Sequence, residues 1–366
     1  MPTVADLVAA LEQIAPRSLA LPGDPGGLQV GSASTPLTRA LVALDCTLAL
    51  VRQAAHEGAQ ALVVHHPPIY RPLSALAGEE HPLPVLRAAV EQGIAIVAAH
   101  TNWDAAEGGV NDTLAARLSL HDVAPFGQDA LARSYKLVTF LPAGSADPLL
   151  DALADAGCGQ IGLYRRCAFL SPGAGTFEPQ PGAQPAIGEV GSRETVEEVR
   201  VEMIVPEHAR EQAIHVLAQH HPYDEPAFDL YELANGAAIS IARAGLLPEP
   251  LPARELRPFV DTALGSRSRL FGPPERSVSR VAVVGGTGGD YWASAMAAGC
   301  DALVTGEVRH HEAVAAAEAG FVLVDAGHFH TEHPGMEALA PRLAAALPEV
   351  RCDAVVPQDG SAGNPA

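Results

Sequence analysis

Basic residues are scarce in this chain of 366 residues, which carries 23 Lys and Arg against 43 Asp and Glu, for a net charge of −20. Proteins that bind nucleic acid generally need a basic surface that replaces counterions along the phosphate backbone. The composition therefore argues against nucleic acid as a partner. Local positive charge can still be supplied by a bound metal ion.

Long hydrophobic runs are also absent. No segment approaches the roughly 18 consecutive apolar residues of a membrane span, and the first residues, MPTVADLVAALEQIAP, lack the basic start of a secretory signal. Thr3, Asp6 and apolar residues at helical spacing predict a capped amphipathic helix there instead. We expect a soluble, cytoplasmic protein with no membrane partner.

The five cysteines are scattered along the chain and include no C-x-x-C pair. An odd, dispersed set is not typical of a disulfide scaffold or of a thiolate zinc site. We interpret these residues as small buried hydrophobic side chains in a protein of a reducing compartment.

Alternating strand and helix patterns are what the sequence does contain. Between residues 39 and 120, and again after residue 279, short apolar runs alternate with longer stretches of helical periodicity. The runs are continuously apolar, which is typical of a parallel sheet covered on both faces. Both segments are therefore predicted to be α/β.

Residues 133–236 follow a different order, namely strand, helix, two strands around a Gly- and Pro-rich loop, helix and strand. This order resembles a ferredoxin-like split βαβ unit. We predict an inserted ferredoxin-like α+β domain at 133–236. The flanking segments, 1–132 and 237–366, are predicted to form one discontinuous three-layer α/β core with a largely parallel sheet. The small, polar tail PQDGSAGNPA is predicted to be frayed.

Imidazole and carboxylate side chains follow three of the predicted strands. They are His65 and His66 in ALVVHHPPIY, His100 and Asp104 in IAIVAAHTNWD, and His328, His330 and Glu332 in FVLVDAGHFHTEHPG. Each group alone is also compatible with a solvated turn, a buried polar pair or a helix cap. Because parallel α/β sheets place ligands beyond the carboxyl ends of their strands, the three groups together predict one metal site.

The charges of these side chains indicate the kind of site. Neutral His65, His66 and His328 with anionic Asp104 and Glu332 supply five N or O donors and two negative charges. These donors would saturate the coordination of one divalent ion, but they would leave free coordination positions on two ions. Two ions ~3.5–4 Å apart that share Glu332 can stabilise both the attacking and the leaving oxygen of a hydrolysis. The donors suit Zn, Fe, Mn, Co or Ni and do not choose among them.

Two further motifs remain open to more than one interpretation. The Gly-rich VVGGTGGDY fits neither G-x-G-x-x-G nor the P-loop spacing, so we favour a tight turn that lines the same cavity over a nucleotide cradle. In TGEVRHHEA, Glu307, His310 and His311 could reach the site from a fourth strand end. Glu307 is a candidate acid/base, against the alternatives of helix capping and support of the metal ligands.

Four ordered motifs carry a resemblance to a known family. HHPPIY, HTNWDAAEGGVND, TGEVRHHEA and DAGHFHTE resemble the GTP cyclohydrolase 1 type 2 homologues, also called Ngg-interacting-factor-three-like or dinuclear-metal-centre proteins. The resemblance implies two divalent ions per chain. It places the metal ligands at His65, His66, Asp104, His328 and Glu332, with Glu332 bridging. It leaves His100 beside the ligands, as a supporting residue or as a catalytic proton shuttle.

The same resemblance implies a toroidal homohexamer with sites facing an internal cavity, and an insertion similar to CutA-like and PII-like domains. Residues 221–233, HPYDEPAFDLYEL, look like the signature of that insertion. One departure stands near the start, where GDPGGLQVG replaces the family's W-D-N-x-G-L-Q-V-G. Asp24 is kept, but Pro25 stands in place of the asparagine.

These observations lead to two hypotheses of function. The first is a dinuclear metal-dependent hydrolase, GTP cyclohydrolase-like or a nucleotide phosphohydrolase, which uses activated water on a nucleotide or related small anionic substrate. The second is a non-enzymatic, metal-binding regulatory hexamer in which the insertion senses or gates.

Overall fold

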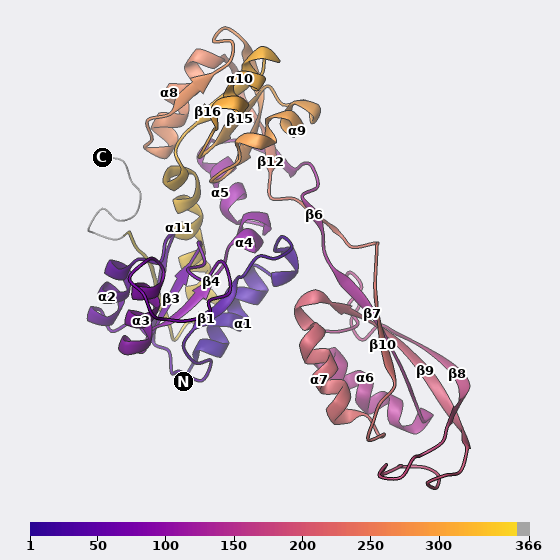
Figure 1. Ribbon diagram of the computed structural model, residues 1–366. Coiled ribbons are helices and arrows are strands. Elements are labelled where there is room, and N and C mark those ends of the chain that lie inside the picture. The colour runs from indigo at the N-terminus through magenta and orange to yellow at the C-terminus, as the bar shows by residue number, and fades with distance from the viewer. Residues whose placement is uncertain (357–366) are drawn as a thin grey trace. The chain divides into compact units, whose positions relative to one another are not determined.

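The computed structural model describes residues 1–356, and the tail predicted to be frayed, 357–366, lies outside this range. The chain divides into two compact units (Figure 1). The core unit consists of Met1–Ala130 and the chain from Ile239 onward, and the inserted unit consists of Leu131–Ala238.

The first sheet of the core unit has the strand order β1-β4-β3-β2-β17. Its strands are β1 (Gly27–Val30), β2 (Arg39–Ala43), β3 (Ala61–Val64), β4 (Ala95–Ala98) and β17 (Arg351–Ala354). All pairs are parallel except β1 with β4. Every residue of β3 and β4 is buried, which explains why their sequences are continuously apolar.

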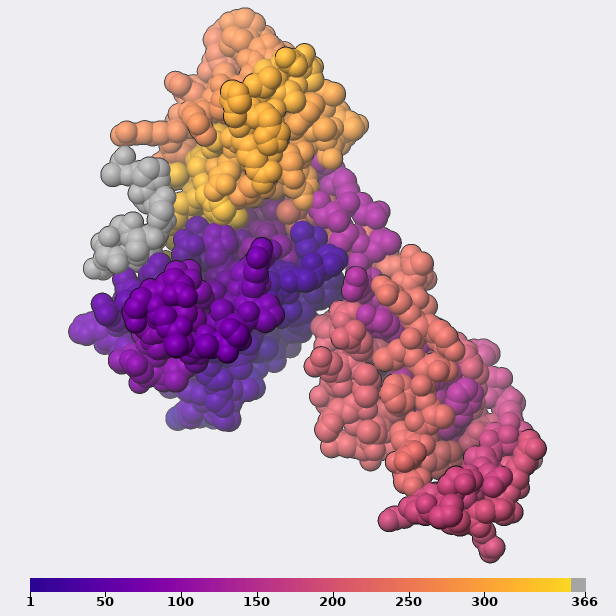
Figure 2. Space-filling model, viewed as in Figure 1, coloured from indigo at the N-terminus to yellow at the C-terminus, as the bar shows by residue number. Residues whose placement is uncertain are grey.

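Helices cover both faces of this sheet. They are α1 (Val4–Ile14), α2 (Leu48–His56), α3 (Leu83–Gln92) and α11 (His328–Ala346). Alternate strand residues pack against α1 and α11 on one face and against α2 and α3 on the other. In the core unit, indigo and purple atoms of the N-terminal segment therefore lie against yellow atoms from α11 (Figure 2).

The second sheet of the core unit has the order β13-β16-β15-β14-β12-β5. Its strands are β5 (His121–Pro125), β12 (Arg243–Pro252), β13 (Arg269–Phe271), β14 (Ser277–Val284), β15 (Ala302–Thr305) and β16 (Val322–Asp325). Only the pairs β14–β15 and β15–β16 are parallel. The helices of this part are α5 (Val110–Arg117), α8 (Ala253–Leu264), α9 (Trp292–Ala297) and α10 (His310–Glu318), whereas the short helix α4 (Thr101–Ala105) packs its Trp103 into the core of the first sheet.

The prediction of an α/β core is confirmed, but its strands divide between two sheets instead of forming one largely parallel sheet. The apolar pattern shows that a strand is covered on both faces, but it does not show which strand pairs with it. The C-terminal strand β17 returns to pair with β2, so the last strand belongs to the sheet of the first segment.

The inserted unit is a four-stranded antiparallel sheet of order β10-β7-β9-β8. In chain order its elements are β7 (Ser134–Leu141), α6 (Ala146–Asp155), β8 (Ala168–Phe177), β9 (Glu194–Pro206), α7 (Arg210–His220) and β10 (Phe228–Glu232). Both helices pack on one face of the sheet. The first and third strands lie in the middle, which is the ferredoxin-like arrangement predicted from the sequence.

Two short strands, β6 (Ala130–Leu131) and β11 (Ala238–Ile239), pair with each other.

No helix within residues 1–356 is long and apolar enough to cross a membrane. All five cysteines are free thiols. Cys46, Cys158 and Cys300 are buried as expected, whereas Cys167 and Cys352 are partly exposed.

A buried arginine joins the second sheet to the helices beside it. Arg243 on β12 is 5% exposed and donates from Nε to Asp112 at 2.5 Å and from Nη2 to the carbonyl of Ala105 at 2.7 Å. Its Nη1 donates to the carbonyl of Ser240. One side chain thus satisfies acceptors on α4, on α5 and in the short segment between β11 and β12.

We predict that Arg243→Leu lowers the free energy of unfolding by about 3 kcal/mol, because it leaves a partly buried carboxylate and two carbonyls without their donor. The matched control is Arg254→Leu, which removes an exposed ion pair with Glu275 and should cost less than about 1 kcal/mol. Urea unfolding followed by circular dichroism measures both. Equal losses in the two variants would contradict the role assigned to Arg243.

Candidate metal centre

The predicted ligands all lie beyond the carboxyl ends of strands in the core unit. His65 and His66 follow β3, Asp104 lies in the short helix α4 after β4, and His328 and Glu332 occupy the first turns of α11 after β16. The structure brings these five side chains together, although they come from segments more than 220 residues apart.

The Glu332 carboxylate lies at the centre of the group. Its Oε2 is 2.8 Å from Nε2 of His328 and 3.1 Å from Nε2 of His66. Its Oε1 is 3.8 Å from Nε2 of His65, which in turn is 3.5 Å from Oδ1 of Asp104. Each carboxylate oxygen therefore faces a different set of donors, which is the arrangement that a bridging carboxylate requires.

Each of the three imidazoles is held through its other nitrogen. Nδ1 of His65 lies 2.9 Å from the carbonyl of Ala99, and Nδ1 of His66 lies 2.7 Å from Asp45. Such partners make Nδ1 the donor, so that in the neutral form of each ring, which is the form that binds metal, the lone pair of Nε2 is directed at the centre. Asp45 was not predicted from the sequence, although it follows β2 by two residues and so occupies a strand end like those of the ligands.

Glu307 holds the third imidazole. Its Oε1 lies 2.7 Å from Nδ1 of His328, and its Oε2 accepts a hydrogen bond from the Thr287 hydroxyl at 3.0 Å. The bond from His328 is the largest cause that lowers the pKa of Glu307 below its ordinary value. This geometry favours the supporting role that was the alternative to acid/base catalysis for Glu307.

The other candidate histidines differ in position. A ring nitrogen of His100 lies within 4.8 Å of ring nitrogens of His65 and His66, so this residue borders the centre. His330 belongs to neither group of metal-compatible side chains found within residues 1–356, and its ring packs edge-on against Phe329. His310 and His311 begin α10 and are exposed.

Helix α4 is fixed against α11 by Trp103, which is fully buried and donates from its indole to the carbonyl of Gly335 at 3.1 Å. This bond holds the helix that carries Asp104 against the helix that carries Glu332.

A Gly-rich turn lies on the other side of the Glu332 carboxylate. Gly286 has a φ of +61°, and a Cβ built on it would overlap Oε1 of Glu332. The motif VVGGTGGDY therefore forms a tight turn against the centre.

The charges at the centre are strongly coupled. Burial opposes the charged form of His66, but Asp45 and Glu332 outweigh it and raise its pKa to about 10. Burial likewise opposes ionisation of His328, yet Glu332 and Glu307 raise its pKa to about 9. Burial alone would raise the pKa of Glu332 by favouring its neutral form, but the surrounding imidazoles hold this pKa well below the ordinary value.

The donor set fits divalent metal ions. His65 Nε2 and Asp104 Oδ1 are buried, lie 3.5 Å apart and have no hydrogen-bond partner within the described chain. Buried polar atoms without a partner are costly, and a cation placed between these two would satisfy both. Imidazole nitrogens with carboxylates and no thiolate suit Zn, Fe, Mn, Co or Ni.

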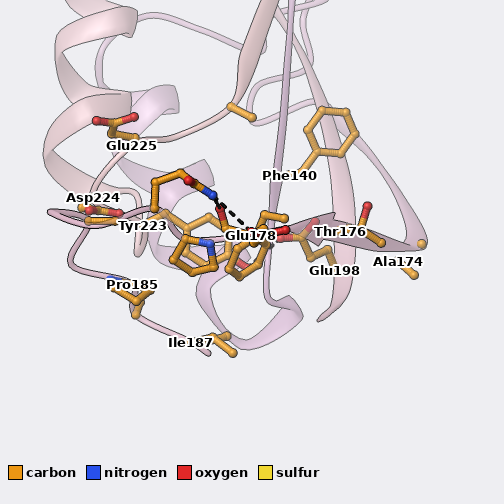
Figure 3. A pocket seen from close by; sticks show the side chains of 18 of the residues that line it. Phe140, Ala174, Thr176, Glu178, Pro185, Ile187, Glu198, Tyr223, Asp224 and Glu225 are labelled. Atoms are coloured by element: carbon orange, nitrogen blue, oxygen red, sulfur yellow. Dashed lines mark hydrogen bonds between the residues drawn. The ribbon is translucent and has the colours of Figure 1, made fainter. Parts of the chain in front are cut away.

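Cavities lie both at and away from this centre. One of about 390 Å³ opens beside His66 and is lined also by Asp45, Thr47 and His81. A larger one of about 980 Å³ lies wholly within the inserted unit (Figure 3), where the Tyr223 hydroxyl donates to Glu198 at 2.6 Å. Its lining includes no histidine or cysteine, and both groups of metal-compatible side chains found within residues 1–356 lie in the core unit.

The α/β core gathers three imidazoles and two carboxylates at its strand ends, and a ferredoxin-like unit interrupts it. These features define a class of candidate metal-binding proteins. Residues 2–358 match the family model Duf34/NIF3 (NGG1p interacting factor 3), and the chain belongs to this family. The resemblance seen in the four sequence motifs is therefore confirmed.

Several relatives are similar over nearly their whole length. A GTP cyclohydrolase 1 type 2 homolog of Halalkalibacterium halodurans is 39% identical over 324 residues, which cover 88% of this chain and 87% of the relative. One from Bacillus subtilis is 36% identical with the same coverage. The crystal structure of a Bacillus cereus protein related to NIF3 is 35% identical, with a TM-score of 0.69 over 97% of this chain and 96% of that one.

We predict that Gly286→Ala displaces the Glu332 carboxylate and lowers the metal content per chain to less than half, because the added methyl group occupies the place of Oε1. Gly299→Ala is the matched control, since Gly299 also has a positive φ but nothing lies within 4 Å of its added Cβ. Both variants carry the backbone strain, but only Gly286→Ala should lose metal in elemental analysis. Equal metal contents would contradict the assigned contact.

We also predict that metal loading at pH 7 releases at least about two protons per chain, because the raised pKa values of His66, about 10, and of His328, about 9, favour protonated rings that must become neutral to bind metal. The number should fall as the pH rises through the two raised pKa values. Titration calorimetry in buffers of different ionisation enthalpy measures the release. His330→Asn, outside the centre, should leave it unchanged, and a release near zero would show that these imidazoles are already neutral.

Proposed function

We propose that this protein is a dinuclear metal-dependent hydrolase that acts on a nucleotide or a related small anionic substrate. The observation that carries the proposal is the position of Glu332, whose two oxygens face two separate sets of donors. A carboxylate between two donor sets, in a buried site with unpartnered polar atoms, is suited to bridging two ions.

In this proposal the two donor sets divide between the ions. His65, Asp104 and Oε1 of Glu332 would hold one, and His66, His328 and Oε2 of Glu332 would hold the other. A pair of divalent ions lowers the pKa of bound water and stabilises negative charge on the group under attack. The two carboxylates neutralise only half of the four positive charges, so the centre attracts an anion despite the acidic composition of the chain.

The chain's own residues supply orientation. Asp45, Glu307 and the Ala99 carbonyl fix the three imidazoles before any metal or substrate arrives. Such partners typically change metal affinity or activity by about 10–100-fold when removed. The cavity beside His66 is large enough for part of a small molecule and gives access to the centre from one side.

The curated relatives are named GTP cyclohydrolase 1 type 2 homolog, and this name makes GTP the first substrate to test. Opening of the purine ring at C8 is a hydrolysis that activated water can perform, and so is cleavage of a phosphate ester. For the assembly we propose the homohexamer that the family resemblance implies.

We predict that Glu332→Gln lowers the metal content from about two ions per chain to less than one. GTP hydrolysis should fall roughly a hundredfold or more, because the variant loses both the bridge and its charge. Glu337→Gln is the matched control on the same helix, since Glu337 is half-exposed and pairs with Arg117 and His333, neither of which belongs to the candidate ligand set. Elemental analysis and chromatography of the nucleotide products give the two readouts.

The two hypotheses of function separate in the same experiment. Two ions per chain without turnover of GTP or of other nucleotides would favour the regulatory hexamer. Full metal content in Glu332→Gln would overturn the ligand set itself.

A further inference from the structure

A fourth imidazole borders the metal centre and is not used by the five-donor set. The ring of His100 lies 5.2 Å from that of His65 and 5.9 Å from that of His66, measured between centroids. Its side chain is 19% exposed, so it lies between the fully buried His65 and solvent. The exposed ring of Tyr70 lies edge-on to it, 6.2 Å away.

Asp24 holds this imidazole. Its Oδ1 lies 3.0 Å from Nδ1 of His100, and its Oδ2 accepts hydrogen bonds from the backbone N–H of Thr101, at 2.9 Å, and from the Thr101 hydroxyl. The side chain of Asp24 is only 2% exposed. Both oxygens are therefore committed to one short segment, His100 and Thr101, at the start of α4.

The loop that carries Asp24 is itself anchored. The Arg17 guanidinium donates to the carbonyls of Asp24 and Gly26. Gln29 on β1 donates to the carbonyl of Pro25 at 2.6 Å. Because the contact at position 25 is made by a backbone carbonyl, proline can stand there without loss of this bond.

Gln29 also ties the same loop to the segment after His65 and His66. Its amide exchanges two hydrogen bonds with the backbone of Ile69, at 2.9 Å and 3.1 Å. The motif GLQVG thus fixes the Asp24 loop to the HHPPIY segment, and Asp24 in turn fixes His100. The position of the fourth imidazole is set by the same framework that sets the metal donors.

The partner on Nδ1 determines the tautomer of His100. An ionised carboxylate can only accept, so Nδ1 carries a proton, and in the neutral ring Nε2 then carries a lone pair. Nε2 of His65, His66 and His328 each lies within 3.8 Å of a carboxylate oxygen of the centre. Within the described chain, Nε2 of His100 makes no hydrogen bond or ion pair, which leaves it available to a bound molecule.

We propose that Asp24 is a positioning residue that fixes His100 with an unprotonated Nε2, and that this nitrogen accepts a hydrogen bond from a protonated oxygen of the molecule bound at the metal centre. The proposal rests on the proposed metal-dependent function. It assigns His100 to recognition of the bound molecule and not to the ligand set.

Nuclear magnetic resonance of the zinc-loaded full chain tests the tautomer. Long-range ¹H–¹⁵N spectra of the imidazoles should show His100 protonated at Nδ1 only, and Asp24→Asn should abolish this preference while zinc stays at about two ions per chain. Asp45→Asn is the matched control, because Asp45 holds the imidazole of a predicted metal ligand, His66. This variant should weaken zinc binding by about 10–100-fold instead. An unchanged tautomer in Asp24→Asn, or a zinc loss equal to that of Asp45→Asn, would overturn the proposal.

Inorganic phosphate is the probe for the hydrogen bond, because its monohydrogen form carries a P–OH donor. Asp24→Asn and His100→Asn should each weaken phosphate binding to the zinc-loaded protein about fivefold, the loss expected for one hydrogen bond. His330→Asn should bind as the wild type does. Equal phosphate affinity in all variants would overturn the assigned contact, even if Asp24→Asn failed to fold, because His100→Asn tests it independently.

Neither readout depends on turnover. If the wild-type protein hydrolyses no nucleotide while the tautomer and phosphate results hold, the proposed reaction fails and the role of Asp24 stands. If nucleotides are hydrolysed but His100→Asn binds phosphate as tightly as the wild type does, the proposed reaction stands and the role assigned to His100 fails.

Discussion

A buried carboxylate surrounded by imidazoles is the constraint on which the rest of the core unit depends. Glu332 is 5% exposed, and an isolated anion at such a depth would be strongly unfavourable. The imidazoles of His65, His66 and His328 surround it and favour its charged form, and divalent ions held at the same place would compensate this charge. Gly286 permits the close approach, because any side chain there would occupy the place of a carboxylate oxygen.

Around this carboxylate the molecule repeats one device, an imidazole oriented by an acceptor on its Nδ1. Asp45, Glu307, Asp24 and the Ala99 carbonyl each hold one ring, and none of the four acceptors belongs to the predicted ligand set. All lie in the connections that flank the strands of the core unit. The sheets therefore position both the donors and the groups that orient them, so the site is organised before it is filled.

The sequence allowed the strand ends and their donors to be predicted, because continuous apolar runs that stop at histidines are visible without a structure. The partners of the imidazoles were less accessible, since nothing in the spacing of Asp24 or Asp45 shows which ring each will face. Glu307 was a candidate acid/base from its residue type and its place after a fourth predicted strand, and only the geometry shows its carboxylate bound to His328. The two-sheet division was also missed, because burial patterns do not encode strand partners.

Helix α11 begins at the metal centre with His328 and Glu332, and its later residues Leu339 and Leu343 pack into the core of the first sheet. The donors from β3 and α4 leave the ribosome well before those from α11, with the whole inserted unit in between. A nascent or truncated chain that ends before residue 328 carries an incomplete centre. Under the proposed function, tight metal binding would therefore require a chain that has been synthesised through the start of α11.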